Sequence, residues 1–171
     1  TRASMSDPIS FLLILHLLTS IGNALVIVDA EGAVYRAPHR TAAFGKQLPY
    51  NISSGITIVD FTTHPANFFA CRDSSMLGVS GRLAVVKEGP CSYEIQVLHA
   101  QKNGALGVLV AASFKNAQLI RMSCTGNTDC SVIHIPAVYI SSETEELIQS
   151  LSTPGISRNS STVMYLNGTG D

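Results

Sequence analysis

The sequence predicts an α/β fold of the α+β class, and three observations carry that prediction. Residues 81–112 read as a strand, a turn, a helix and a second strand within about 30 residues. Short runs rich in β-branched residues recur before and after that unit, as is typical of buried strands. A second helical pattern follows near residues 143–151. At 171 residues the chain is long enough for one domain with its own core.

The first 24 residues have the pattern of a secretory signal peptide. The apolar run FLLILHLL at residues 11–18 is too short for the ~20 residues that span a bilayer. Gly22 and Ala24 place small residues at the −3 and −1 positions, which predicts cleavage after Ala24. Residues 1–4 precede Met5 and read as upstream or vector-derived sequence. The alternative is a membrane anchor or a buried helix that extends through Val28.

The segment after the expected cleavage site predicts mostly strands. Residues 25–37 read as two strands joined by a turn at residues 30–32, which predicts a hairpin. Residues 36–48 are interpreted as a surface loop because they hold a proline and several polar residues. Residues 56–59 form another β-branched run, and a mixed loop then leads to Cys71.

The central unit predicts a parallel strand pair with a right-handed helical crossover. A buried strand at residues 83–86 ends in a turn at residues 88–90. Ser92 is placed to cap the helix, and Glu94 lies in its first turn, where the helix dipole favours a carboxylate. Gly104 ends the helix, and residues 108–110 form the second strand. The apolar face of the helix comprises Tyr93, Val97, Leu98 and Ala100.

The last third of the chain predicts two more strands and a helix. Residues 114–121 read as a short helical turn or an irregular excursion, and residues 124–130 as a polar loop closed by cysteines. A strand at residues 134–140 contains a proline, which belongs near its start or at a sheet edge. Residues 141–142 cap a helix at residues 143–151, and residues 162–166 form the final strand.

Composition excludes some classes of function. Hydrophobic residues make up 46% of the chain and charged residues 13%, with a net charge of −1. This balance disfavours disorder and gives no basic surface for nucleic acid. No nucleic-acid partner is therefore expected.

The four cysteines favour disulfides, because an even count behind a signal peptide indicates an oxidising compartment. Four cysteines allow three pairings, and spacing alone does not choose among them. The competing interpretation is a zinc site, because His134 lies four residues after Cys130. That spacing lacks a close cysteine pair and a clear fourth ligand, so no metal ligand is assigned.

No catalytic motif is present in the sequence. The histidines lack H-E-x-x-H spacing, and neither G-x-S-x-G nor a phosphate-binding loop occurs. His99 on the predicted helix is interpreted as a surface or core-edge side chain, and no catalytic residue or cofactor is assigned. Three N-x-S/T sequons, at Asn51, Asn159 and Asn167, predict glycosylated surface turns in a secreted chain.

The central unit resembles the signature of the protease-associated (PA) domain. The resemblance rests on Gly81, the apolar strand, Gly89, Cys91-Ser92-Tyr93, Ala100-Gln101 and Asn103-Gly104-Ala105. It implies one PA domain over residues 25–171, with a β-rich core sheet or open barrel and two or three flanking helices. It also implies a cystine that reaches the turn before the helix, hence Cys71 with Cys91 and Cys124 with Cys130. PA domains are non-catalytic modules on luminal or extracellular parts of proteases, sorting receptors and membrane-bound ubiquitin ligases.

The layout of residues 48–166 is similar to the luminal domain of the type 2 signal peptide peptidase-like proteases. That likeness rests on Leu48-Pro49, the β segment before Cys71, Ile135-Pro136 and the strand at 163–165. It implies a module of a membrane protein anchored after Asp171, with the aspartic protease activity in another part. The implied partners are substrate or cargo ectodomains, on the luminal or extracellular side of endosomal, lysosomal, Golgi or plasma membranes. The ectodomain of a sorting receptor or of a RING ubiquitin ligase, and a free-standing secreted hydrolase, are the alternatives.

Overall fold

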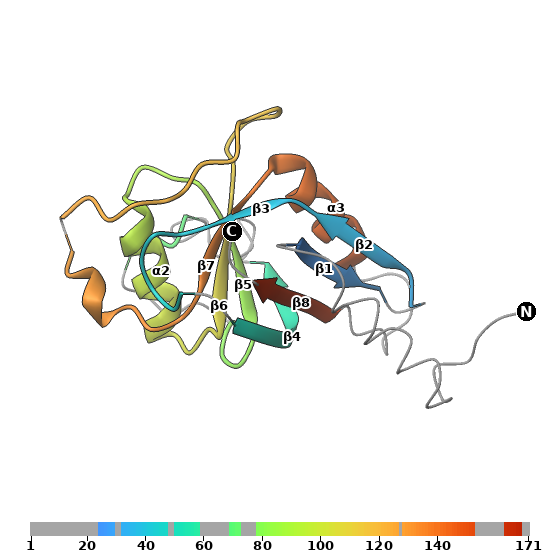
Figure 1. Ribbon diagram of the computed structural model, residues 1–171, viewed down its shortest axis with the longest axis horizontal. Helices are drawn as coiled ribbons and strands as arrows, with labels where there is room; N and C mark the ends of the chain where they lie inside the picture. Colours follow the sequence, from blue (N-terminus) through green and yellow to red (C-terminus); the bar gives the residue numbers. More distant parts are fainter. Residues whose placement is uncertain are drawn as a thin grey trace, which may run out of the picture.

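The computed structural model describes residues 24–29, 32–47, 50–58, 69–72, 78–126, 128–152 and 163–168. These ranges form one mixed eight-stranded sheet with helices α2 and α3 beside it (Figure 1). The predicted α+β class is confirmed. The strands are β1 (Ala24–Val28), β2 (Val34–Ala37), β3 (His39–Thr41), β4 (Tyr50–Ile58), β5 (Leu83–Lys87), β6 (Gly107–Ala111), β7 (Ala137–Ile140) and β8 (Val163–Gly168). The helices are α2 (Tyr93–Lys102), the 3-10 turn η1 (Cys130–Val132) and α3 (Ser142–Ser152).

The strand order is β2-β1-β8-β4-β5-β6-β7-β3. Strands β4, β5, β6 and β7 run parallel to one another, and the remaining neighbours are antiparallel. The predicted parallel strand pair is confirmed, because β5 pairs in parallel with β6 and helix α2 lies between them in the chain. The predicted hairpin is confirmed as well, since β1 and β2 pair from Leu25 with Ala37 to Val28 with Val34.

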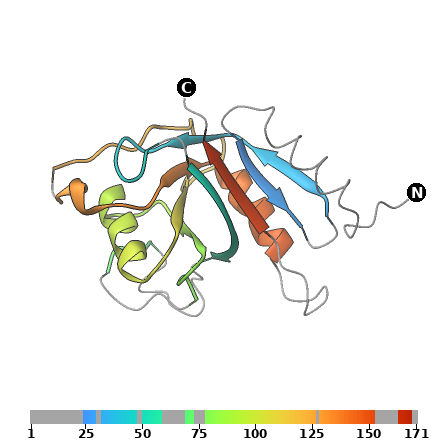
Figure 2. The same ribbon diagram turned by 60° about the horizontal axis from the view of Figure 1, so that its bottom comes forward.

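The two end strands of this order, β2 and β3, follow one another in the chain with only Pro38 between them. Proline has no N–H to donate, so the ladder is interrupted there and the chain changes partner from β1 to β7. Because one short ribbon serves both ends, the sheet must curl toward itself. Figure 2 shows β2 and β3 as one ribbon spanning the curved sheet. The expectation of a curved, barrel-like sheet therefore has a covalent cause.

Strands β5, β6 and β7 are almost entirely apolar because both of their faces are covered, and β5 ends in the less buried Lys87. Alternate residues point to opposite faces and build two separate cores. The core under α2 contains Ala84, Val86, Val97, Ala100, Val108, Val110 and Tyr139, among others. The core under α3 contains Leu83, Val85, Leu109, Val138, Ile140 and Ile148, together with Leu25 and Ile27 of β1.

Helix α2 ends as the sequence predicts but begins differently. Gly104 has a φ of +83°, its N–H donates to Gln101, and the Ala105 N–H donates to Ala100. This pair of hydrogen bonds is the Schellman arrangement, which requires a residue in the left-handed conformation and therefore favours glycine. Ser92 occupies the N-cap position, but its hydroxyl makes no capping hydrogen bond to the first turn. The predicted side-chain cap at Ser92 is wrong.

Helix α3 is capped by the first of the two predicted serines. The Ser141 hydroxyl accepts a hydrogen bond from the Thr144 N–H at 3.2 Å. Leu147, Ile148 and Leu151 pack into the second core, as their spacing predicts.

Several sequence boundaries need correction. Residues 36–48 are not all loop, because β3 pairs with β7 there from His39 to Thr41. Residues 114–121 contain no helical turn, so the irregular excursion is the correct alternative. Residues 24–28 form a strand, which contradicts a helix extending through Val28.

The other predicted signal-peptide residues lie outside the described ranges, so cleavage after Ala24 stays a prediction. Within the described ranges, no helix combines the length and apolar character needed to cross a membrane.

The two serines at the start of α3 give a matched test of the cap. Ser141→Ala should lower the free energy of unfolding by about 1 kcal/mol, because one N–H of the first turn loses its acceptor. Ser142→Ala should be neutral or slightly stabilising, since the buried Ser142 hydroxyl has no partner among the described residues. Urea unfolding of both variants measures this. Equal losses in the two variants would contradict the assignment of the cap.

Candidate interaction surface

The carboxyl ends of the parallel strands β5, β6 and β7 lie at one edge of the sheet. The residues that follow β5 and β6 are therefore neighbours. Ser113, just after β6, donates its hydroxyl to the Glu88 carbonyl at 2.8 Å and its N–H to the Glu88 carboxylate at 3.2 Å. Ligand sites in parallel sheets occur at this edge, so the loops here are the first place to look for function.

The Glu88 carboxylate joins four parts of the fold. Besides the Ser113 N–H, it accepts a short hydrogen bond from the Tyr93 hydroxyl on α2 and a 3.0 Å bond from Tyr139 on β7. The two tyrosine rings meet edge to face, with their centroids 6.0 Å apart. One side chain thus connects the end of β5, helix α2, strand β7 and the start of the loop after β6.

The ionisation of this cluster follows from its contacts. Partial burial of Glu88 opposes ionisation, but the hydrogen bonds from Tyr93, Ser113 and Tyr139 outweigh it and lower the pKa of the carboxyl. Burial and the contact with Glu88 raise the pKa of both tyrosines, so both remain neutral hydrogen-bond donors. The cluster therefore fixes a charged acceptor between neutral donors.

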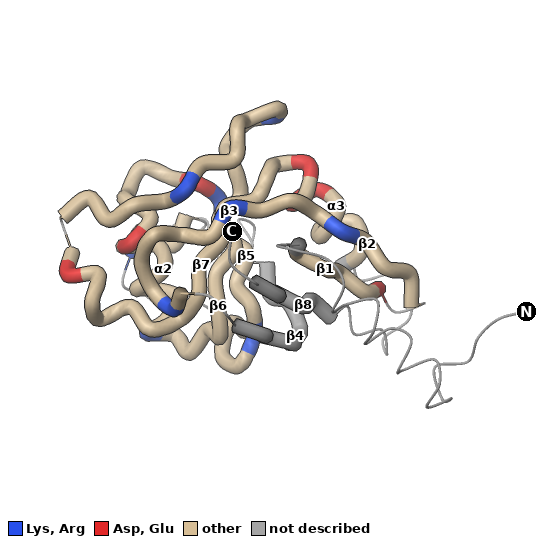
Figure 3. Tube along the Cα trace, in the orientation of Figure 1, with Lys and Arg blue, Asp and Glu red and all other residues tan. Residues whose placement is uncertain are grey.

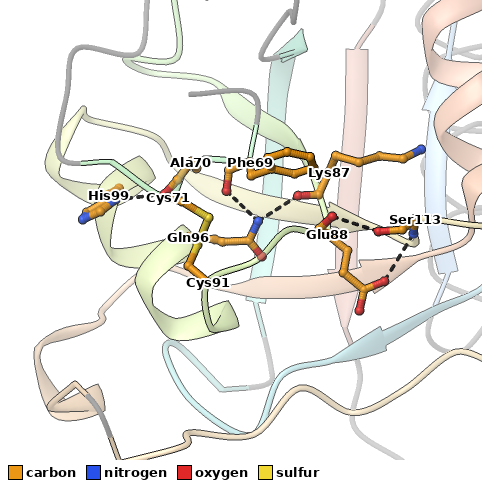
Figure 4. The surroundings of a disulfide bond; sticks show 9 residues. All are labelled: Phe69, Ala70, Cys71, Lys87, Glu88, Cys91, Gln96, His99 and Ser113. Atoms are coloured by element: carbon orange, nitrogen blue, oxygen red, sulfur yellow. Dashed lines mark hydrogen bonds between the residues drawn. A yellow bond between two sulfur atoms is a disulfide. The ribbon is translucent and has the colours of Figure 1, made fainter. Parts of the chain in front are cut away.

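The Cys71–Cys91 disulfide closes the neighbouring loop, and side chains of α2 donate hydrogen bonds to backbone carbonyls close to that disulfide (Figure 4). The fully buried Gln96 side chain donates to the carbonyls of Phe69 at 2.6 Å and Lys87 at 2.7 Å. The Nδ1–H group of the His99 ring donates a hydrogen bond to the Ala70 carbonyl at 2.9 Å. Ala70 has a φ of +51°, an unfavourable conformation for a residue with a Cβ. The hydrogen bond and the adjacent disulfide hold that conformation, and His99 has a structural role.

The loop after β6, residues 113–126, is called the excursion below. It leaves the carboxyl edge of the sheet and projects beyond it (Figure 1). Its first turn is held to α3, because the Asn116 N–H donates to Glu143 at 3.0 Å and Lys115 pairs with Glu146 at 3.1 Å. Its far end is held to α2, because the buried Glu94 accepts from the N–H of Thr125 at 3.1 Å and from its hydroxyl.

The ionisation of Glu94 and Glu143 supports these two attachments. Burial of Glu94 opposes ionisation, but the hydrogen bonds from Thr125 outweigh it and lower the pKa of its carboxyl. The pKa of the exposed Glu143 is lowered chiefly by the hydrogen bond from the Asn116 backbone. Both carboxyls are therefore charged acceptors at neutral pH. They hold the excursion at its two ends.

The excursion also lies against the residues that follow β3. The Ala43 N–H donates to the Met122 carbonyl at 2.8 Å, and the Met122 side chain is fully buried. Ala117 and Leu119 are partly buried against the core under α2. The structure thus places the described residues that follow β3 beside those of the excursion.

Other side chains of the excursion face solvent. Phe114 is 67% exposed and Ile120 is 38% exposed, although both are large and apolar. Gln118 and Arg121 are exposed beside them. Apolar side chains held on a fixed, exposed segment are a common feature of protein-binding surfaces. The excursion together with β3 is therefore the candidate interaction surface.

A second disulfide and one glutamine fix the chain beyond the excursion. Cys124 is joined to Cys130. Gln101 on α2 donates to the Val132 carbonyl at 2.8 Å and accepts from the N–H groups of His134 and Ile135 at 2.6 and 3.2 Å. This glutamine bridges the loop that leads into β7.

The other predicted site residues have the following outcomes. The disulfides join the pairs that the resemblance implies, so the thiolates of Cys124 and Cys130 are not available to zinc. No cluster that could hold a metal occurs in the described part of the chain. Asn51 and Asn167 lie opposite one another in β4 and β8, so their predicted placement in turns is wrong. Asn159 lies outside the described residues, and glycosylation of all three stays a prediction.

Sequence reasoning missed the polar side chains that organise this surface. Glu94 and Gln96 are completely buried although they lie on a helix whose apolar face was identified separately. The sequence pattern around Glu88 predicts only a turn. Polar residues on a short helix are normally assigned to solvent, so nothing in the sequence pattern distinguished them.

Comparison with known proteins identifies related folds. A family model for the PA domain matches residues 24–148. A search of curated proteins finds no match. Among solved structures, the aminopeptidase from Aneurinibacillus sp. strain AM-1 is similar with a TM-score of 0.58 and 16% identity, over 88% of this chain and 32% of that chain. The zinc aminopeptidase BSAP from Bacillus subtilis is similar with a TM-score of 0.56 and 15% identity, over 95% of this chain and 38% of that chain.

A third similar structure is the psychrophilic subtilisin-like protease Apa1 from the Antarctic psychrotroph Pseudoalteromonas sp. AS-11. Its TM-score is 0.52 and its identity 11%, over 86% of this chain and 33% of that chain. The chain therefore spans about a third of the length of these proteins. At such identities the likeness establishes the fold.

The Glu88 cluster predicts an acid-dependent part of the stability. Because the pKa of Glu88 is lower in the folded than in the unfolded chain, its charge stabilises the fold above the ordinary glutamate pKa. That stability is lost as the pH falls through the lowered value. Glu88→Gln should therefore lose less stability than the wild type between about pH 6 and about pH 3. Tyr139→Phe, which removes one donor, should give an intermediate loss. Urea unfolding at several pH values in this range measures the loss. If the free energy of unfolding depended on pH in the same way in all three proteins, the prediction would be refuted.

The two disulfides should contribute unequally. They close loops with sequence separations of 20 and 6 residues. On the chain-entropy account, Cys71→Ala with Cys91→Ala should cost about 3 kcal/mol, and Cys124→Ala with Cys130→Ala about 2 kcal/mol. Thermal and urea unfolding of the two double variants measures the difference. A larger loss from the Cys124–Cys130 pair would contradict the ranking.

Proposed function

The chain belongs to the PA domain family, and we propose that it is a non-catalytic protein-binding module on the luminal or extracellular side of a membrane protein. The PA domain is a protease-associated module and typically an accessory one. Its two disulfides fit a protein of the secretory pathway or the cell exterior. The role of such a module is to hold a protein partner or substrate near another part of the molecule.

The proposed parent is an intramembrane aspartic protease of the signal peptide peptidase-like type. Support comes from the sequence layout of residues 48–166 described above, which resembles the luminal domain of those proteases. In that setting the chain would recruit the ectodomain of a membrane-anchored substrate. Cleavage would take place in a separate part of the protein.

The observation that carries the proposal is the fixed excursion with its exposed Phe114. A flexible loop would lose conformational entropy on binding, whereas this one is already held by Glu88, Glu143 and Glu94. An aromatic side chain presented on a rigid support supplies apolar contact area at low entropic cost. The surface is therefore suited to a protein partner.

The identity of the parent is tested by the full-length transcript that contains this chain. Several apolar spans with a pair of aspartates after Asp171 would support the protease. A single span followed by a RING domain would contradict it in favour of a ubiquitin ligase. A single span with a short sorting tail would contradict it in favour of a sorting receptor.

The recruiting role is tested in cells with the full-length protein. Phe114→Ser should reduce cleavage of a membrane substrate with its complete ectodomain by about tenfold, the effect of a single interface residue worth about 1.4 kcal/mol. Cleavage of the same substrate with a trimmed ectodomain should not change. Leu106→Ser is the matched control, because Leu106 is 42% exposed but precedes β6, at the opposite edge of the sheet.

Unchanged cleavage of both substrates by the Phe114→Ser protein would refute the recruiting role. An equal fall for both substrates, with reduced protein at the cell surface, would indicate misfolding. Ile120→Ser then serves as the second variant, since Ile120 is less extensively exposed and lies on the same segment.

A further inference from the structure

Residues 117–121 of the excursion have the burial pattern of a strand without a partner strand. Burial alternates from Ala117 to Ile120, because Ala117 and Leu119 pack on the core while Gln118 and Ile120 are exposed. Arg121, which follows, is exposed as well. Among the described residues, no hydrogen bond engages the backbone N–H groups of this segment. Backbone groups of this kind are donors and acceptors available to another chain.

Two exposed arginines lie in this region. Arg40 is exposed on β3 and Arg121 is exposed at the end of the segment. The Ala43–Met122 hydrogen bond brings their two stretches of chain together. Within the described ranges, neither arginine forms an ion pair, whereas the nearby Lys115 is paired with Glu146. Figure 3 shows basic positions on β3 and on the neighbouring excursion.

We propose that residues 117–121 are a strand-addition site for an extended peptide segment that carries alternating apolar and acidic side chains. This inference rests on the proposed protein-binding function and specifies its partner. The backbone of the peptide would pair with the unpaired backbone of the segment, which gives affinity without regard to sequence. Its apolar side chains would contact Phe114 and Ile120, and its carboxylates would face Arg40 and Arg121.

A second copy of the chain is a less suitable occupant of this site. Two copies paired along the same segment would bring Arg121 and Arg40 of both copies to one edge. Like charges that face one another across strands are destabilising. An acidic peptide removes that repulsion and gains from the same two charges.

The test uses the secreted chain and a fluorescent peptide of about eight alternating glutamate and valine residues, the length of an ordinary strand. Two control peptides have the same length. One replaces glutamate by lysine, and the other keeps glutamate but carries N-methyl groups on alternate backbone nitrogens. The acidic peptide should bind, the lysine peptide should not, and the N-methylated peptide should bind weakly or not at all. Amides of residues 117–121 should become protected from hydrogen exchange when the acidic peptide is bound.

Variants of the chain separate charge from shape. Arg121→Glu and Arg40→Glu should each weaken binding of the acidic peptide by about fivefold at low salt, as for one exposed ion pair. The double variant should instead bind the lysine peptide. Ile120→Ser should weaken binding, while Val34→Ser should not, because Val34 is 45% exposed but lies on β2. Binding should also weaken as salt is raised.

Absence of binding by the acidic peptide would overturn the inference, as would equal binding of the N-methylated peptide. Self-association of the chain that is abolished by Ile120→Ser would overturn it in favour of a second copy. The proposed function and the strand-addition site are tested by different results. If Phe114→Ser impairs recruitment while the peptide does not bind, the function stands and strand addition is wrong.

Discussion

The loops of this protein depend on hydrogen bonds donated and accepted by the side chains of helix α2. Glu94, Gln96, His99 and Gln101 each engage backbone groups of a loop that otherwise lacks a strand partner. A buried backbone polar group without a partner costs free energy comparable to a lost hydrogen bond. The helix therefore has two structural roles, since its apolar residues complete a core while its polar residues determine the conformation of the surrounding chain.

That arrangement links the sheet to the candidate interaction surface. The curled sheet brings the carboxyl ends of β5, β6 and β7 together, and Glu88 joins them to α2 through Tyr93 and Tyr139. Gly89 beside it must lack a side chain, because a Cβ there would lie 2.4 Å from that of Phe69. The disulfide at Cys91 then fixes the same turn covalently. The excursion starts from this rigid edge, which allows an exposed aromatic residue to keep one position.

The sequence was sufficient to predict those features that depend on local pattern. The β5-α2-β6 unit, the first hairpin, the glycine that ends α2 and the apolar side of α3 all follow from spacing and turn residues. The three residues of β3 could not be recognised, because their pairing with β7 is distant in sequence and follows a proline. Ser92 and Ser141 have equivalent sequence signals, yet only the hydroxyl of Ser141 caps a helix. The neighbourhood of Arg40 and Arg121 likewise arises from tertiary contact alone.

Hydrogen exchange of the free protein tests most directly whether Glu88 and the side chains of α2 and α3 hold the excursion in one conformation. The amides of Ser113, Asn116 and Thr125 donate to Glu88, Glu143 and Glu94, although none of the three lies in a strand or helix. We predict that these amides exchange much more slowly than those of an unstructured peptide and that Glu94→Leu accelerates exchange at Thr125 selectively. Exchange of all three in the wild type at the rate of an unstructured peptide would contradict a preorganised surface.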